Sequence, residues 1–340
     1  AQCLVGSEMC IRDRQWDLVN YHTFSGGLST LVHNGMAAPI DDLVEQYGQD
    51  AAAAVGEEMM AAGVVDGQLY SIPSINVWAS SYGVAISSAI LDELNIDAST
   101  LKTWDDVHEA FLKMKEAHPD MYPLVPAWGG GGMQKAFAFD NLGTGFWDGL
   151  GILENVHEGS TTVVNMFETD SYREFVEMMY QWNQEGLLMP GATTTTESTK
   201  DLINTVGYAS IENFTPQKKQ ELANGIYWKG KEGTAVEIVD PFIPCDAGGS
   251  SYFIPYVSEH PEKAMQLWNL MYTDADLANA LTYGVEGEDY EFTDDTHEMV
   301  IRDTDSTYGH IGWSWPNESI AAVVEGVDVD IWDQNKSFRE

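Results

Sequence analysis

Acidic side chains are the most numerous groups in this chain that could do chemistry. Neighbouring carboxylates occur at Glu57/Glu58, Asp105/Asp106 and Glu286/Glu288. Two carboxylates that flank a glycosidic bond can hydrolyse it. The chain has 54 acidic residues among 340, however, so such pairs arise by chance. A solvated acidic face is the better interpretation of these pairs.

Other catalytic and metal-binding patterns are equally weak. The eight histidines show no HExxH or HxH spacing, and no Gly-x-Ser-x-Gly elbow occurs. Asp328, Asp330 and Asp333 resemble a calcium loop, but no glycine stands at the turn position and Trp332 interrupts the pattern. We therefore expect no metal site, no cofactor and no enzymatic activity.

Glycine and cysteine add no stronger candidate. The run of four glycines at 129–132 lacks the Gly-Lys-Ser/Thr that completes a phosphate-binding loop, so a ligand-side loop is expected there. Apart from Cys3 and Cys10 near the start, Cys245 is the one cysteine. A single thiol gives neither a disulfide framework nor a cysteine-rich metal site.

Charge narrows the range of partners. The net charge is −38, with 16 basic residues against 54 acidic ones. Such a chain has no basic surface for phosphates, which argues against nucleic acids and anionic membranes. A neutral ligand, or a partner that presents basic residues, fits best. The length suits two domains, and no run of eighteen apolar residues occurs.

The elements that would position a site alternate between strands and helices. Strands are expected at 15–19, 84–86, 123–128, 206–214, 237–240 and 250–255, with an Asp-Gly hairpin at 65–73. Helices are expected at 28–33, 51–62, 88–94, 103–117 (capped by Thr103), 171–185 and 217–225. A further helix begins at Ser258 as N-cap, and its Trp268 and Met271 are expected in the core.

The order of several segments resembles one family. Residues 35–43 (GMAAPIDDL), 66–73 (DGQLYSIP), 102–106 (KTWDD), 258–274 (SEHPEKAMQLWNLMYTD) and 283–292 (YGVEGEDYEF) follow the pattern of the extracellular solute-binding proteins of ABC importers, sugar-binding type 1. The last segment is typical of a lipoprotein subgroup with a C-terminal extension domain. Each piece is moderately specific, and their order carries the resemblance over residues 16–340.

The resemblance implies a fold and a function. The expected fold is the two-lobed α/β periplasmic-binding-protein fold of type II. The implied function is capture of a carbohydrate, such as an oligosaccharide, by lobe closure and its delivery to a membrane ABC permease. The protein would be a monomer, lipid-anchored outside the cell or periplasmic. Two alternatives stay open: a secreted carbohydrate-active enzyme with a carboxylate pair, and a non-transport sensor or adhesion module.

The domain boundaries follow from the same resemblance. We expect residues 15–78 and 248–288 in the first lobe, 79–247 in the second, and 289–340 returning to the second lobe and beginning a truncated extension. Residues 1–14 resemble a translated sequencing adapter, so we expect them to be foreign and disordered. Family members begin with an export signal and a first βαβ unit, so we expect an internal fragment with an incomplete first lobe.

A sugar-binding site needs aromatic rings for the apolar sugar face and polar side chains for the hydroxyl groups. Candidates are residues on loops beside the ends of expected strands, where open α/β sheets bind ligands. The predicted ligand-binding residues are Trp78, Tyr82, Trp128, Asp140, Trp147, Glu212, Asn213, Ser251, Tyr283 and Glu286.

Overall fold

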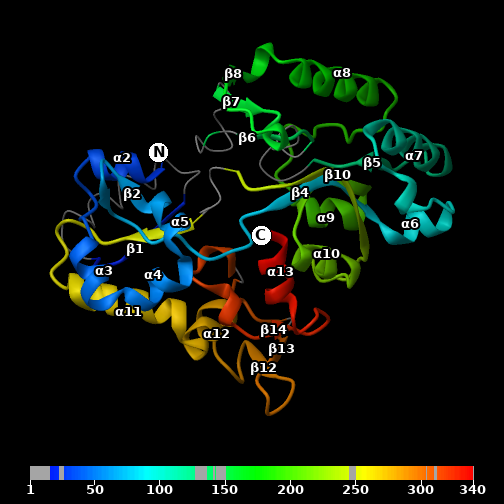
Figure 1. Ribbon diagram of the computed structural model, residues 1–340. Coiled ribbons are helices and arrows are strands. Elements are labelled where there is room, and N and C mark those ends of the chain that lie inside the picture. Colours follow the sequence, from blue (N-terminus) through cyan, green and yellow to red (C-terminus); the bar gives the residue numbers. More distant parts are fainter. Residues whose placement is uncertain are drawn as a thin grey trace. The chain divides into compact units, whose positions relative to one another are not determined.

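The computed structural model describes residues 16–22, 27–126, 136–140, 142, 151–244, 250–303, 305–309 and 312–339. The chain forms two compact units (Figure 1). The described residues up to Trp78 and from 250 to 325 belong to the first unit, and the others belong to the second. The chain therefore passes between units more than once, so each unit is built from separate segments of sequence.

The first unit combines short strands with helices. Its elements are β1 (Val19–His22), α2 (Gly27–His33), α3 (Asp41–Tyr47), α4 (Gln49–Val55), α5 (Glu57–Met60), η2 (Ala61–Gly63), β2 (Val64–Val65), β3 (Gln68–Leu69), β11 (Ser250–Phe253), α11 (Pro261–Thr273), α12 (Ala275–Tyr283), β12 (Tyr290–Phe292), β13 (Met299–Arg302), η7 (Gly312–Ser314), η8 (Glu318–Ile320) and β14 (Val323–Val324).

Helix α11 supplies the centre of the first unit's core. Its Met265 and Trp268 are fully buried and pack against Ile72 and Tyr252, together with residues of α4. Strand β11 pairs antiparallel with β1, which brings residues more than 200 positions apart into register. The prediction that Trp268 and Met271 belong to the core is confirmed, since Met271 is 6% exposed. Burial of such large side chains stabilises the unit strongly.

Two predicted boundaries in this unit were wrong for one shared reason. The first strand begins at Val19 rather than at residue 15, and His260 rather than Ser258 is the N-cap of α11. The Asp17 carboxylate accepts hydrogen bonds from the Ser258 hydroxyl (2.5 Å) and the His260 backbone N–H (3.2 Å). Asp17 therefore forms hydrogen bonds to the residues at the start of α11 and is not part of a strand.

Two turns follow from local chemistry. Asp66 and Gly67 both have positive φ (51° and 83°), as the tight hairpin between β2 and β3 requires. The predicted hairpin is thus confirmed. The single helix predicted over 51–62 is instead broken at Gly56, whose φ of 86° and ψ of 154° no helix accommodates.

The second unit contains the larger sheet. Its elements are β4 (Ser80–Ser87), α6 (Ser88–Glu93), η3 (Ala98–Thr100), α7 (Trp104–Ala117), β5 (Tyr122–Leu124), β6 (Phe139–Asp140), β7 (Gly151–Glu154), η5 (Val156–Glu158), β8 (Val163–Asn165), η6 (Met166–Glu168), α8 (Asp170–Gln184), α9 (Thr199–Thr205), β9 (Gly207–Phe214), α10 (Pro216–Ala223), β10 (Gly233–Phe242) and α13 (Ile331–Arg339).

A four-stranded sheet in the order β10-β4-β9-β5 separates two layers of helices (Figure 1). Alternate side chains of a strand point to opposite faces. Val84 and Ile86 therefore join the core formed with α6, α7 and α8, whereas Ala85 packs with residues of α9 and α10. The sheet is buried on both faces over its central strands, which fixes its register.

Helix α7 begins as its sequence predicts. The Thr103 hydroxyl accepts a hydrogen bond from the Asp106 backbone N–H (3.2 Å), and the Asp106 carboxylate accepts one from the Thr103 N–H (2.9 Å). This reciprocal capping box satisfies two donors that a helix start leaves unpaired. The predicted Thr103 cap is confirmed.

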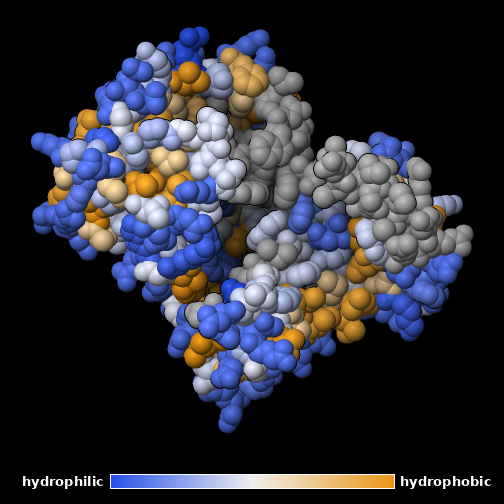
Figure 2. Space-filling model, turned by 180° about the vertical axis from the view of Figure 1, so that it is seen from behind, coloured by the Kyte–Doolittle hydropathy of each residue, from blue (hydrophilic) through white to orange (hydrophobic). Residues whose placement is uncertain are grey.

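On the face that Figure 2 shows, hydrophilic residues cover much of the coloured surface, with hydrophobic ones in smaller groups between them. The exposed large hydrophobic side chains of β8, η6 and α8 are Val163, Phe167, Val176 and Tyr180. Among the described residues, no helix is long and apolar enough to cross a membrane.

Candidate functional site

The candidate site of the second unit lies at one edge of its sheet. Strands β5 and β9 run parallel, so their carboxyl ends lie at the same edge. The Thr199 hydroxyl, at the start of α9, donates to the Pro126 carbonyl (2.9 Å) just beyond β5. Open α/β sheets bind ligands at such carboxyl ends. Glu212 and Asn213 stand near the end of β9, at this edge.

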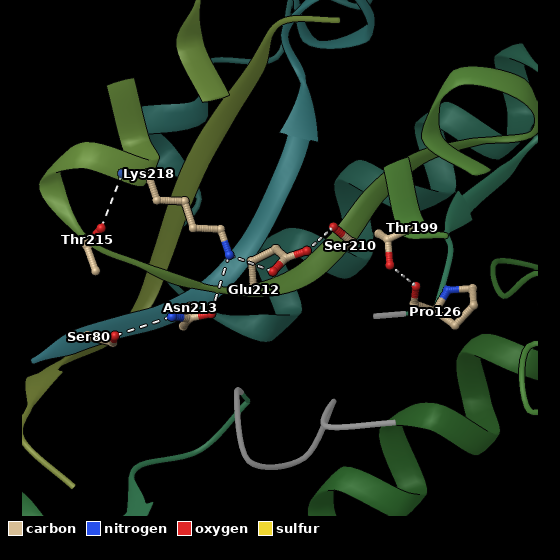
Figure 3. A network of polar contacts seen from close by, with 8 residues as sticks. All are labelled: Ser80, Pro126, Thr199, Ser210, Glu212, Asn213, Thr215 and Lys218. Atoms are coloured by element: carbon tan, nitrogen blue, oxygen red, sulfur yellow. Dashed lines mark hydrogen bonds and ion pairs between the residues drawn. The ribbon is translucent and has the colours of Figure 1, made fainter. Parts of the chain in front are cut away.

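A buried polar network occupies this edge (Figure 3). The Glu212 side chain is only 4% exposed, and its two carboxylate oxygens have different partners. Oε1 accepts from the Ser210 hydroxyl (2.9 Å), and Oε2 forms an ion pair with Lys218 Nζ (2.8 Å). A buried carboxylate is tolerated when a cation and hydrogen bonds satisfy it. Predicted as a ligand contact, Glu212 thus anchors a lysine in this structure.

The aromatic ring of Tyr227 packs against the Lys218 ammonium group. The lysine Nζ lies 4.5 Å from the centroid of the Tyr227 ring, and Lys200 Nζ lies 4.6 Å from the same centroid. Both contacts are within the range of cation–π attraction. Burial, and then the negative charge of Glu212, raise the pKa of the Tyr227 phenol well above its usual value. Tyr227 therefore stays neutral and serves as an apolar wall for the ammonium groups.

Two aromatic rings and an amide lie next to this network. Tyr82 of β4 stands opposite Asn213 of β9 in the sheet register, and Ser80 stands opposite Phe242 of β10. The Tyr82 and Phe242 rings are 5.4 Å apart with an interplanar angle of 34°. We refer to Ser80, Tyr82, Asn213 and Phe242 as the aromatic–amide cluster. All four residues are half-buried. Lys218 Nζ of the buried network donates to Asn213 Oδ1 (3.4 Å).

His157 extends the cluster. Its Nε2 donates to the Asp240 carbonyl (3.0 Å), and its ring contacts Phe242 edge-on at 5.6 Å. The contact thereby joins η5, which carries His157, to the end of β10. Rings in fixed orientations beside an amide can cover the apolar face of a sugar and bond to its hydroxyl groups.

Another predicted residue of this unit, Asp140, lies in a different sheet. Asp140 is buried on β6, where its Oδ1 accepts from the Leu142 backbone N–H (2.8 Å). Strand β6 belongs to the separate sheet with β7 and β8. Trp128, predicted to contact the ligand, and Trp147 lie outside the described residues. The ligand contacts of these three residues stay predictions.

Trp78 and Ser251 take well-defined positions in the first unit. Trp78 has an unusual φ of 56°, and its indole N–H donates to the Ser74 carbonyl (3.0 Å). It is half-buried against the core that contains Trp268. The Ser251 hydroxyl donates to the Ile72 carbonyl (2.6 Å) and is buried, so it holds β11 to the segment before Trp78.

Tyr283 and Glu286 lie in different environments, because Tyr283 is buried and Glu286 is exposed. Tyr283 ends α12 and is 2% exposed, and its hydroxyl donates to the Ala322 carbonyl (2.6 Å). Glu286 is exposed in the turn before β12. Tyr283 thus has a core position in the first unit.

Sequence reasoning overlooked several residues that the structure brings to these places. Phe242 lies beyond the predicted end of β10, and Lys218 lies on a helix with no distinctive motif. In the first unit, the His22 and Trp313 rings lie 5.2 Å apart, and Trp313 is 47% exposed. These two residues lie nearly 300 positions apart in the sequence.

No cluster suited to a metal is formed by the histidine, cysteine, aspartate and glutamate residues that the structure describes. Asp328, part of the calcium-like pattern, accepts from the side-chain amides of Gln220 (3.0 Å) and Gln334 (3.3 Å). These contacts hold α13 against α10.

Comparison with known proteins defines the class. Residues 13–278 match the family described as bacterial extracellular solute-binding protein. The match covers most of the chain, and the chain therefore belongs to this family. The prediction of a solute-binding protein rather than an enzyme is confirmed by this membership.

Particular relatives agree with the fold. The chain is 24% identical over 314 residues to a carbohydrate ABC transporter substrate-binding protein of Streptococcus pneumoniae serotype 4 (strain ATCC BAA-334 / TIGR4), covering 90% of this chain and 62% of that protein. The chain thus spans less than two thirds of that relative. The crystal structure of the N-glycan transport solute binding protein NgtS from Streptococcus pneumoniae aligns with a TM-score of 0.81 at 21% identity, over 98% of this chain and 72% of that one.

A second solved structure is more distant. The S. pneumoniae ABC-transporter substrate-binding protein FusA in complex with kestose aligns with a TM-score of 0.60 at 14% identity, covering 99% of this chain and 75% of that one. These likenesses show the α/β periplasmic-binding-protein fold, as the sequence predicted.

Proposed function

We propose that the protein captures a carbohydrate for an ABC importer and performs no chemistry on it. The observation that carries this proposal is the aromatic–amide cluster at the carboxyl edge of the second unit's sheet. There, Tyr82 and Phe242 form a pair of rings beside the Asn213 amide. Rings and an amide in this arrangement match the two kinds of surface that a sugar presents.

The named ligands of the similar proteins favour an oligosaccharide. NgtS has been crystallised with Man1GlcNAc and with Man5GlcNAc, and FusA with kestose. The curated relative is itself described as a carbohydrate ABC transporter substrate-binding protein. We therefore propose an oligosaccharide as the ligand of this chain.

A binding experiment tests the proposal. The protein is titrated by calorimetry with Man1GlcNAc, Man5GlcNAc and kestose, and its thermal unfolding is followed with each sugar. Binding to the native state raises the unfolding temperature as the sugar concentration rises. The recovered sugar is then analysed by chromatography and should be unchanged. Absence of binding to all three, or cleavage of a bound sugar, would contradict the proposal.

We also propose the finer assignments that the sequence suggested. These are the type II form of the fold, the lobe boundaries given above, membership of the lipoprotein subgroup, a monomeric state, and delivery to a membrane permease from the outer face of the cell membrane. The family's description as extracellular supports the location. The complete reading frame and its neighbouring genes test the lipoprotein subgroup, the location and the delivery, because a lipid-attachment cysteine and adjacent permease genes are expected. An experimental structure and the molar mass in solution test the fold type, the lobe boundaries and the monomeric state.

A further inference from the structure

We propose that Lys218 is a positioning residue that sets the orientation of the Asn213 amide and thereby makes Asn213 a hydrogen-bond donor to the ligand. This inference rests on the proposed carbohydrate-binding function. It concerns two residues that lie close together at the carboxyl edge of the second unit's sheet (Figure 3).

The orientation of the amide follows from the chemistry of lysine. An ammonium group has donors only, so it must face the oxygen of an amide and not the nitrogen. Lys218 Nζ lies 3.4 Å from Asn213 Oδ1. The Asn213 Nδ2 group is therefore turned the other way, where it donates to the Ser80 hydroxyl at 3.4 Å.

Lys218 can impose this orientation because it is itself held firmly. Its side chain is 15% exposed, and its Nζ is paired with the buried Glu212 carboxylate at 2.8 Å. Ser210 fixes that carboxylate from the other side, and the Tyr227 ring covers the ammonium. A long flexible side chain normally loses rotamer freedom at a cost, but here the ion pair and the ring offset that cost.

The consequence is a defined hydrogen-bonding role. The amide nitrogen has two hydrogens, and the Ser80 contact uses one. The second hydrogen has no partner among the described residues. Asn213 is half-buried and stands directly opposite Tyr82 in the sheet. A sugar lying on the Tyr82 ring would therefore meet an N–H donor, which suits a hydroxyl or ring oxygen acting as acceptor.

The test uses substitutions that distinguish an effect on the orientation of the Asn213 amide from an effect on the stability of the folded protein. Lys218→Met removes the donors but leaves Glu212 buried without its cation, so it is combined with Glu212→Gln, which removes that charge and can still accept from Ser210. Lys219→Met is the matched control, because Lys219 lies next in α10 and pairs with Glu237 at a half-exposed position. Lys218→Arg retains donors. The probe is whichever of Man1GlcNAc, Man5GlcNAc or kestose the unaltered protein binds most tightly.

We expect the Glu212→Gln/Lys218→Met protein to bind that sugar at least about tenfold more weakly than the unaltered protein does. The Lys218→Arg protein should keep most of the unaltered protein's affinity. The affinity of the Lys219→Met protein should stay within about twofold of that of the unaltered protein. Asn213→Asp keeps an acceptor for Lys218 but loses the N–H donor. It should therefore weaken sugar binding as much as the Glu212→Gln/Lys218→Met change does. Adding it to the double variant should cause little further loss, since coupled residues are not additive.

The outcomes separate the two proposals. If the unaltered protein binds one of the sugars and the double variant binds it equally well, the inference about Lys218 is overturned while the proposed function stands. Fully additive losses from the Lys218 and Asn213 changes would also overturn it, because they would indicate a merely structural lysine. If the unaltered protein binds none of the three sugars, the proposed function and this inference fall together.

Discussion

Lys218 Nζ and Glu212 Oε2 form a buried ion pair at 2.8 Å, with side chains 15% and 4% exposed. The next residue of α10, Lys219, forms an ion pair with Glu237 at 3.2 Å. In that pair, however, the Lys219 side chain is 34% exposed and the Glu237 side chain is 39% exposed. Burial therefore distinguishes two neighbouring lysines that have the same chemistry. This difference gives each of them a separate expected effect on stability.

Replacing Lys218 by alanine should lower the free energy of unfolding by about 3–5 kcal/mol, because the Glu212 carboxylate would stay buried without a cation. Replacing Lys219 by alanine should change it by about 1 kcal/mol or less, as for other half-exposed pairs. Urea unfolding followed by circular dichroism measures both. Equal effects of the two substitutions would contradict the buried role of Lys218.

Tyr82 should matter for ligand binding more than for stability. Tyr82→Ala removes one ring of the pair with Phe242, and we expect the affinity for the tightest-binding sugar to fall about tenfold or more. Tyr180→Ala is the control, because Tyr180 is 67% exposed and lies on α8, which carries no residue of the cluster. Calorimetric titration measures both variants. A Tyr82 variant with unchanged affinity would remove the cluster from the proposed site.

Local sequence signals predicted much of the fold. The Thr103 cap, the Asp-Gly hairpin and the buried face of α11 were all predictable because each depends on residues close together in the chain. The N-cap of α11 was not, because Asp17, 241 positions away from Ser258, binds the hydroxyl that would have capped the helix. A contact of that separation leaves no periodic trace in the sequence.

The candidate site was predictable only in part, for a similar reason. Tyr82 precedes one strand that the sequence indicates, and Glu212 and Asn213 end another, so all three could be proposed as ligand contacts from the sequence. Phe242 was missed because Pro241 ends the strand signal at Asp240. Strand β10 lies at the edge of its sheet, where a proline is tolerated, and the strand therefore continues to Phe242. The role of Lys218 depends on contacts between elements, which sequence patterns do not reveal.

The Thr103 cap has a measurable contribution of its own. Thr103→Ala removes the hydroxyl that accepts from the Asp106 N–H, and the free energy of unfolding should fall by about 1 kcal/mol. Thr161→Ala, at an exposed position between β7 and β8, should change it by less than about 0.5 kcal/mol. Thermal and urea unfolding measure both. Equal stability of the two variants would contradict the importance of the cap.

Acid should weaken the link between Asp17 and the start of α11. The Ser258 hydroxyl, chiefly, lowers the pKa of the Asp17 carboxyl below its ordinary value. The unfolded chain, whose aspartates titrate near pH 3.9, therefore takes up this proton at a higher pH than the folded chain does. The stabilisation is fully present above about pH 4 and is lost as the pH falls through the folded-state pKa.

The variants Asp17→Asn and Ser258→Ala test this directly. Both remove the charged hydrogen bond, so both should flatten the decline of unfolding free energy below about pH 4. Urea unfolding at a series of pH values measures the slope. If both variants decline as steeply as the unaltered protein, the Asp17 contact does not contribute to acid sensitivity.

Gly83 should be irreplaceable at the junction between the core and the aromatic–amide cluster. It lies on β4 next to Tyr82, and a Cβ there would come within 2.1 Å of the Val236 carbonyl oxygen. Strand β10 has an irregular register between Glu237 and Val239, opposite this position. A side chain would push the two strands apart, at a cost of about 1–3 kcal/mol or more.

Gly83→Ala is therefore expected to lower both stability and sugar affinity, because it shifts the strand that carries Tyr82 against the strand that carries Phe242. Gly151→Ala is the control, since a Cβ there would meet only Val163 Cγ1 at 3.4 Å, an ordinary contact. Urea unfolding and calorimetric titration of the two variants measure the two effects. A Gly83 variant that is destabilised but binds sugar normally would show that the ligand does not depend on the spacing of Tyr82 and Phe242.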